Sequence, residues 1–125
     1  MSKLIFVGLH NKRGKMPLCS STKSGKLIQR IIKEGGFTNV LKTNLYDVDY
    51  LPNDDELFML GLDWVDRINP NEDDVLVLLG RFVQDHFPPH SSIELRIAHP
   101  ASKRSHTEMD EYIYKTITLL REYFK

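Results

Sequence analysis

The chain has 125 residues, of which 41% are hydrophobic and 27% charged, the composition of one globular domain that can bury a core of its own. Its single cysteine, Cys19, excludes a disulfide framework within the chain and any zinc or iron–sulfur site built from several cysteines. The formal net charge is zero, but residues 1–43 hold nine basic residues and one acidic residue, whereas residues 44–90 hold two and eleven.

This uneven charge predicts one basic face and one acidic face, and ordinary solvated surface is the alternative interpretation. The first apolar run is too short for a signal peptide, and no stretch approaches the length of a membrane span. We therefore expect a cytoplasmic protein, or a nuclear one in a eukaryote, with no membrane partner.

Short apolar runs predict buried strands, and segments with apolar residues at helical spacing predict amphipathic helices. In chain order, the sequence predicts a strand at 3–8, a helix at 24–36, a strand at 38–45, a helix at 54–68, a strand at 74–80, a short helix at 81–87, a strand at 93–98 and a helix from about 107 to 124. The expected inner faces of the long helices are Leu27, Ile28, Ile31 and Ile32; Leu57, Leu60, Trp64, Val65 and Ile68; and Met109, Ile113, Ile117, Leu120 and Phe124.

Capping signals mark two of the helix starts. Asn53 with Glu56, and Ser105 with Glu108, have the spacing of a capping box, in which side chain and backbone bond each other at the first helical turn. Pro88 stops the short third helix.

Near-continuous apolar strands that alternate with amphipathic helices predict an α/β fold, a three-layer α/β/α domain around a four-stranded parallel sheet. We expect a single domain over residues 1–125 and the strand order 2-1-3-4, numbered along the chain, with right-handed crossovers. In such sheets ligands bind beyond the carboxyl ends of the strands, near the switch point between strands 1 and 3.

Polar and basic side chains gather in the segments that follow the predicted strands. They are His10, Asn11, Lys12, Arg13, Lys15 and Lys23 after the first, Asn44 at the end of the second, and His99, Lys103, Arg104 and His106 after the fourth. This convergence places the predicted ligand site at the carboxyl edge of the sheet.

Each of these features also has a plainer interpretation. The run SSTKSGK at 20–26 can cradle a phosphate or simply start a helix, and it lacks the spaced glycines of a Walker loop. Asn44 can pair with a base edge or be a turn residue. Lys103 and Arg104 can hold phosphates or be plain loop charges. The histidines have no known metal spacing and Cys19 has no paired base, so we expect no metal site and no thiol nucleophile.

With these segments in view, the chain resembles the uracil-DNA glycosylase superfamily over nearly its whole length. The resemblance rests on five segments in the family's order: GLHNK at 8–12, SGKLI at 24–28, KTNLYDVDYLP at 42–52, VLVLLGRFVQDHF at 75–87 and HPASKRS at 99–105. The last is similar to the family's HPS motif followed by a basic residue. The resemblance implies a parallel sheet of order 2-1-3-4 and hydrolysis of the N-glycosidic bond of a damaged or deaminated base in DNA.

The resemblance also implies roles for individual residues. A glycosylase flips the base out of the duplex into a pocket. There, His99 matches the residue that donates to a carbonyl oxygen of the base and stabilises the developing negative charge. Asn44 matches the amide that reads the base edge. The rest of the implied base pocket is Gly8, Leu9 and Leu18, and the implied DNA-binding residues are Lys12, Arg13, Lys23, Ser24, Pro100, Ser102, Lys103 and Arg104.

The segment after the first strand departs from the family pattern. Active families place Asp, Glu or Asn just after the glycine. The family's Glu falls on Leu9, the Asp or Asn falls on His10, and the proline that often follows falls on Asn11, so residues 8–12 hold no carboxylate. His10 can act as a general base, because the ordinary pKa of histidine, about 6.5, suits that role. Asn11 can instead position the water.

Three hypotheses therefore remain open at this point. The first is an active DNA glycosylase with His99, His10 and Asn11 at the reacting atoms. The second is a superfamily member that binds DNA or a nucleobase without hydrolysis. The third is an unrelated α/β domain that binds a nucleotide or a phosphorylated small molecule. For the first two we expect DNA as the partner, no cofactor and a monomeric protein.

Overall fold

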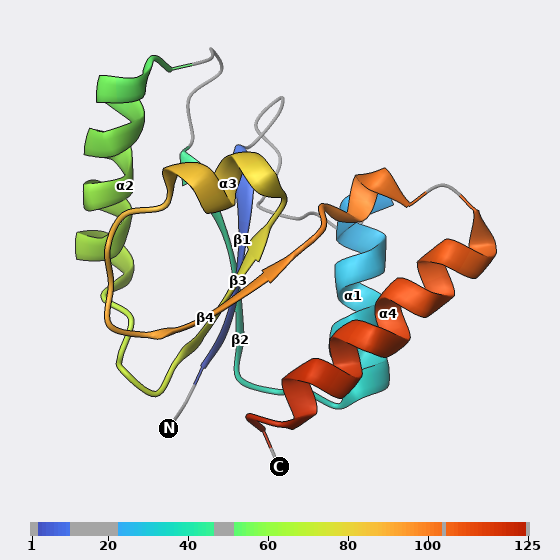
Figure 1. Ribbon diagram of the computed structural model, residues 1–125. Helices are drawn as coiled ribbons and strands as arrows, with labels where there is room; N and C mark the ends of the chain where they lie inside the picture. The colour runs from blue at the N-terminus through green and yellow to red at the C-terminus, as the bar shows by residue number, and fades with distance from the viewer. Residues whose placement is uncertain (1–2, 11–22, 47–51, 104, 125) are drawn as a thin grey trace.

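The computed structural model describes residues 3–10, 23–46, 52–103 and 105–124, with the backbone alone for Leu9, His10, Lys23, Tyr46 and Ala101. In chain order the elements are β1 (Leu4–His10), α1 (Lys23–Gly35), β2 (Val40–Tyr46), α2 (Asp54–Ile68), β3 (Val75–Leu79), α3 (Arg81–His86), β4 (Ile93–Ile97), the 3-10 turn η2 (Pro100–Ser102) and α4 (His106–Arg121) (Figure 1). Strands and helices alternate as predicted.

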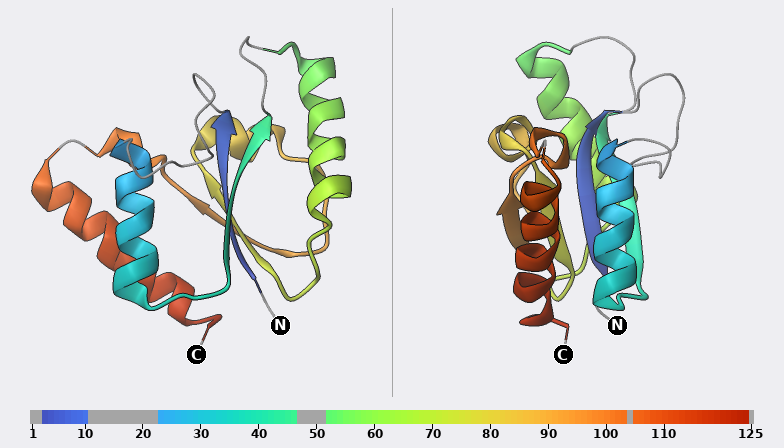
Figure 2. Two further views of the ribbon diagram at one scale, coloured as in Figure 1. Left: turned by 180° about the vertical axis from the view of Figure 1, so that it is seen from behind. Right: turned by 90° about the vertical axis from the view of Figure 1, so that its right-hand side faces the viewer.

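The four strands form one parallel sheet in the order β2-β1-β3-β4, which confirms the predicted α/β fold and strand order. Val7 of β1 lies opposite Thr43 of β2 and Leu78 of β3. Because all four strands run in one direction, their carboxyl ends meet at one edge, where Figure 2 (left) shows the arrowheads of β1 and β2 side by side. Ligands bind at this edge in sheets of this kind.

Helices cover both faces of the sheet, with α1 and α4 on one side and α2 and α3 on the other (Figure 1). Along β1, Leu4 and Phe6 pack towards α1 and α4, while Ile5 and Val7 pack towards α2 and α3. Successive side chains of a strand point to opposite faces, so a strand buried on both sides is apolar throughout. Fully burying one such side chain contributes about 1.5–3 kcal/mol.

The predicted capping boxes begin α2 and α4. Asn53 Oδ1 accepts from the N–H of Glu56 at 2.9 Å, and Ser105 Oγ accepts from the N–H of Glu108 at 3.1 Å. Helix α2 spans the predicted residues and ends where Asn69 adopts a left-handed conformation with φ of 50°. The other elements differ from their predicted bounds by at most three residues at an end, where helices and strands fray.

The inner face of α4 is broader than the apolar residues alone predict. The predicted Ile113 is buried and Ile117 partly so, but Tyr112 and Thr116, outside the predicted stripe, are only 7% and 4% exposed. Their hydroxyls donate to backbone carbonyls, Tyr112 to Ala98 at 2.6 Å and Thr116 to Tyr112 at 2.7 Å. A buried hydroxyl is tolerated when it has such a partner.

A fully buried carboxylate, that of Asp74, lies at the opposite, amino edge of the sheet, just before β3. One of its oxygens accepts from the N–H of Lys3 at 2.7 Å and the other from the N–H of Asn71 at 2.8 Å. Burying a charge is costly unless it is hydrogen-bonded, and these two donors supply the compensation. Asp74 therefore anchors the amino ends of the strands and is remote from the carboxyl edge.

Candidate functional site at the carboxyl edge

Gly8 of β1 and Asn44 of β2 are register partners near the carboxyl edge, and Asn44 is 5% exposed. The residue before it, Thr43, faces α2, because its Oγ1 accepts from the indole N–H of Trp64 at 3.1 Å. Successive side chains of a strand point to opposite faces of the sheet, so Asn44 faces the side covered by α1. Its register partner Gly8 has no side chain on that face. Asn44 brings both an amide donor and a carbonyl acceptor to this edge.

His99, two residues beyond β4, lies against the turn that follows β3. Gly80 in that turn has φ of 91°, a conformation that favours glycine. A Cβ built on Gly80 meets the Cβ of His99 at 3.1 Å and its Cδ2 at 3.5 Å. The missing side chain at Gly80 is what allows His99 to come this close to the turn.

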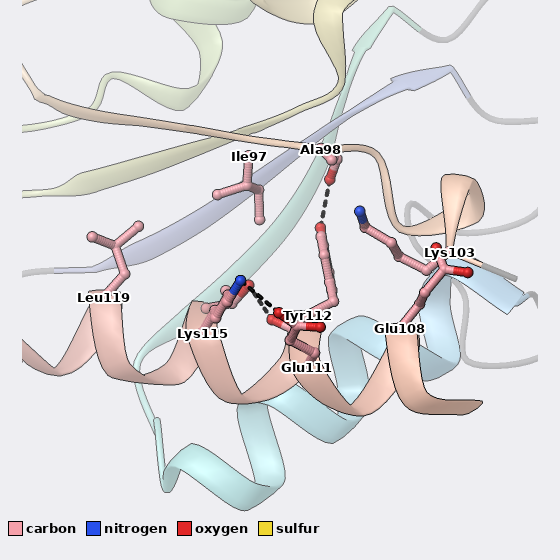
Figure 3. Close-up of a pocket in the computed structure, with 9 residues that line it drawn as sticks. Ile97, Ala98, Lys103, Glu108, Glu111, Tyr112, Lys115 and Leu119 are labelled. Carbon is pink, nitrogen blue, oxygen red and sulfur yellow. Dashed lines mark hydrogen bonds and ion pairs between the residues drawn. The ribbon is translucent and has the colours of Figure 1, made fainter. Parts of the chain in front are cut away.

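Three successive carbonyl groups around His99 are held by hydroxyl or amide side chains from three different elements. The bonds run from Gln84 of α3 to Ile97 at 2.9 Å, from Tyr112 of α4 to Ala98 at 2.6 Å, and from Ser102 of η2 to His99 at 2.7 Å. We call residues 97–102 the His99 turn. Figure 3 shows the bond from Tyr112 to Ala98. Because each carbonyl has its own donor, the backbone that bears His99 is fixed before any ligand binds.

Gln84 also joins two strand ends. Its Nε2 donates to the carbonyl oxygen of Leu78 at 3.1 Å as well as to that of Ile97 at 2.9 Å. The N–H of Gly80 donates to the same oxygen of Ile97 at 3.0 Å. One side-chain amide thus ties the carboxyl end of β3 to that of β4 and keeps Gly80 beside His99.

Replacing Gln84 with leucine is expected to lower the free energy of unfolding by about 1–3 kcal/mol, because the part-buried carbonyl of Leu78 loses a donor. Urea unfolding followed by the fluorescence of Trp64, the single tryptophan, measures the change. Gln29→Leu, on the exposed face of α1, is the matched control and should stay within about 0.5 kcal/mol of the wild type. Equal losses of unfolding free energy in the two variants would contradict the role of Gln84 in joining the ends of β3 and β4.

Tyr112 is 7% exposed, and burial raises the pKa of its phenol well above the ordinary value of 10.0. The neutral phenol is the form that can donate to the carbonyl of Ala98. Burial therefore preserves the donor that holds the middle of the His99 turn.

Raising the pH from about 9 to about 11.5 is expected to destabilise the wild type more steeply than Tyr112→Phe. Above a pH of about 10 the unfolded chain releases this proton and the folded chain keeps it. The contribution of Tyr112 is thus complete below pH 10 and falls by about 1.4 kcal/mol per pH unit above it. Urea unfolding curves at several pH values test this, since the two proteins differ only in the phenol hydroxyl of residue 112. Parallel pH profiles would rule out a buried, protonated Tyr112.

The other predicted site residues are distributed around this edge. Ser24 is half-buried in the first turn of α1, Pro100 is buried, and Lys103 places its Nζ 5.8 Å from the centroid of the Tyr112 ring. Helix α1 packs against η2 and so lies beside the HPAS segment. The backbones of Leu9 and His10 end β1, and that of Lys23 begins α1. The predicted Asn11, Lys12, Arg13, Leu18 and Arg104 lie outside the described residues.

Two residues that hold the His99 turn, Gln84 and Tyr112, are absent from the sequence prediction. Tyr112 lies at helical spacing from Met109 and Thr116, so the period of the inner face could have identified it as buried. Gln84 has no such signal, because its acceptors, such as Leu78, become its neighbours only through the fold.

Among the residues that the structure describes, no three His, Cys, Asp or Glu side chains group together as a metal ion would need. The same part of the chain contains no helix that is both long and apolar enough to cross a membrane. No protein-family model matches the chain, and no curated protein matches it at a significant level.

Proposed function

We propose that the protein is a uracil-DNA glycosylase-like enzyme that hydrolyses the N-glycosidic bond of a damaged or deaminated base in DNA. The observation that carries the proposal is the fixed position of His99, which lies against Gly80 in a turn whose carbonyls are bonded from α3, α4 and η2. Asn44, in the motif KTN, reaches the same edge from β2. Both residues lie in segments that resemble the glycosylase motifs.

In this proposal His99 acts by electrostatic stabilisation. The C–N bond breaks, its electron pair moves onto the base, and His99 donates a hydrogen bond to the carbonyl oxygen where the negative charge develops. Water adds to the sugar carbon, and its proton passes to His10 or to solvent. Such a donor is effective when it is in place before the charge appears. The bonds that hold the His99 turn supply this preorganisation.

Asn44 selects the base. A side-chain amide pairs with a base edge that presents one donor and one acceptor. Because Asn44 is 5% exposed, the affinity for a base depends on how well the base edge matches the donor and acceptor of this amide.

In this proposal basic side chains from the segments that follow the first and fourth strands in the sequence hold the DNA backbone. They are Lys12, Arg13, Lys23, Lys103 and Arg104. Each phosphate contact releases bound counterions, so the affinity for DNA falls steeply as the salt concentration rises.

Binding of DNA or a nucleobase without hydrolysis is the second candidate function. It is favoured by residues 8–12, Gly-Leu-His-Asn-Lys, because they contain no carboxylate to position water or to stabilise a cationic sugar. His99 and Asn44 then hold a base that is not released.

A panel of oligonucleotides with one uracil, hypoxanthine or xanthine, each single- and double-stranded, separates these two functions. With the full chain we expect release of at least one of these bases, detected as an alkali-cleavable site. We also expect binding that weakens between about 50 and 200 mM salt. Salt-dependent binding without release assigns the second function. Absence of both release and binding contradicts both functions.

A further inference from the structure

A cavity of about 450 Å³ lies between β4 and α4 (Figure 3). Ile97 and Ala98 line it from the strand side, and Lys103 lines it from the segment before α4. The remaining lining residues recur every three or four positions along one face of α4, from Glu108 to Leu119. The cavity adjoins the carboxyl edge, because Ile97 and Ala98 belong to the His99 turn and Lys103 is a proposed DNA-binding residue. Asn44 and His99 are not among its lining residues.

Helix α4 packs more closely on α1 than on β4, and the cavity lies on the β4 side of the helix. The two helices pack against each other, and Arg30 of α1 forms an ion pair with Asp110 of α4 at 3.2 Å. β4 is one of the two edge strands and has a strand neighbour on one side only. Tyr112 bridges the resulting gap with its bond to the carbonyl of Ala98, as Figure 3 shows. The space beside that bridge is left open.

The inner wall of the cavity presents mainly apolar groups to a ligand. The hydroxyls of Tyr112 and Thr116 are bonded to the carbonyls of Ala98 and Tyr112, so they are already occupied. What remains facing the space is the ring of Tyr112 and the aliphatic side chains of Ile97 and Leu119. Such a wall favours a flat or branched apolar group.

The mouth of the cavity carries four charges, of which three have close partners. Glu111 pairs with Lys115 at 2.6 Å, and Glu108 accepts from the hydroxyl of Ser105 at 3.2 Å. Lys103 has an aromatic partner instead, with its Nζ 5.8 Å from the centroid of the Tyr112 ring. Within the described residues no ion pair engages Lys103, although its charge contributes, after that of Lys115, to lowering the pKa of the Glu111 carboxyl. The ammonium group of Lys103 is therefore the group at this mouth that can attract an anion.

We propose that this cavity is a binding site for a small aromatic anion, such as an aromatic carboxylate or sulfonate. The anionic group lies against Lys103, and the ring packs on Tyr112 between Ile97 and Leu119. A volume of about 450 Å³ is within the range of small-molecule sites in proteins. The proposal shares Lys103 with the proposed DNA contacts but uses neither Asn44 nor the ring of His99, so it does not depend on base release.

Titration of the full chain with 8-anilinonaphthalene-1-sulfonate, a fluorescent aromatic sulfonate, tests the proposal. We expect saturable binding to one site, weakened about tenfold or more by Leu119→Glu and by Lys103→Glu, which each remove about 1.4 kcal/mol of binding free energy. Lys26→Glu, on the exposed face of α1, is the matched charge control. Leu62→Glu on α2 controls for a second apolar surface, where Phe58 is 57% exposed.

Amide chemical shifts of the ¹⁵N-labelled wild type locate the dye without relying on any variant. The proposal predicts that the signals of Ile97, Ala98 and Leu119 move with saturation, while those of α2 stay in place. Absence of saturable binding overturns it. Shifts centred on Phe58 and Leu62, or binding lost in Leu62→Glu and retained in Leu119→Glu, overturn it as well.

Discussion

Replacing His99 with alanine is expected to slow base release by about 100- to 1,000-fold, roughly 3–4 kcal/mol of transition-state stabilisation. The reason is that His99 is the donor proposed to meet the charge on the departing base. Its backbone is fixed by the bonds from Gln84 and Tyr112. Single-turnover cleavage of whichever lesion the panel identifies measures the effect on the chemical step. The variant should bind the oligonucleotide nearly as well as the wild type, because the phosphate contacts are unchanged.

His106→Ala is the matched control, since His106 is exposed at the first position of α4 and is not part of the His99 turn. It should release the base at the wild-type rate. If His99→Ala also releases the base at that rate, His99 is not the electrostatic donor and the proposed mechanism is wrong. If both variants lose base release to the same extent, the loss is not specific to His99. That result also contradicts the proposed mechanism.

Replacing Gly80 with alanine is expected both to destabilise the protein and to disturb His99. A φ of 91° is unfavourable for any residue with a Cβ, and such strain costs about 1–3 kcal/mol. In addition, the new Cβ sits 3.1 Å from the Cβ of His99, so one of the two turns must shift. Urea unfolding gives the loss of stability, and the base-release rate and the ring NMR signals of His99 report the displacement.

Gly36→Ala separates the two effects. Gly36 also has positive φ, 72°, but a Cβ there meets no atom within 4 Å. This variant should lose stability from backbone strain alone and keep the wild-type rate of base release. If Gly80→Ala keeps the wild-type NMR signals of the His99 ring and the wild-type rate of base release, the close approach of the two turns does not affect function.

The fold follows from the sequence because its signals are local and agree with one another. Apolar runs that begin near Leu4 and Val75, flanked by amphipathic helices, can be buried only in a parallel sheet with helices on both faces. The capping boxes at Asn53 and Ser105 mark helix starts within a few residues of sequence. The predicted order and parallel direction of the strands also bring their carboxyl ends to one edge, where Gly8 and Asn44 are register partners.

The support around His99 could not be predicted, because it depends on contacts between segments distant in sequence. Tyr112 lies 14 residues from the Ala98 carbonyl that it holds, and Gln84 lies 13 from that of Ile97. No spacing in the sequence links such pairs. A glutamine in a six-residue helix is expected to lie on the surface of the protein. The cavity beside α4 could not be predicted from the sequence either, because it depends on how α4 packs against α1. The predictions for Asn11 and Leu18 fall outside the described residues.

The central claim is that Asn44 and His99 belong to one base-binding site. It is tested most directly by NMR of the labelled protein with a single-stranded oligonucleotide that carries one 2′-fluoro-2′-deoxyuridine, a nucleotide that resists release. The claim predicts that the side-chain amide of Asn44, the ring of His99 and the amide of Gly80 shift together at saturation, while Asp74 at the amino edge does not. Shifts confined to the amino edge or to α2, with Asn44 and His99 unchanged, would contradict it.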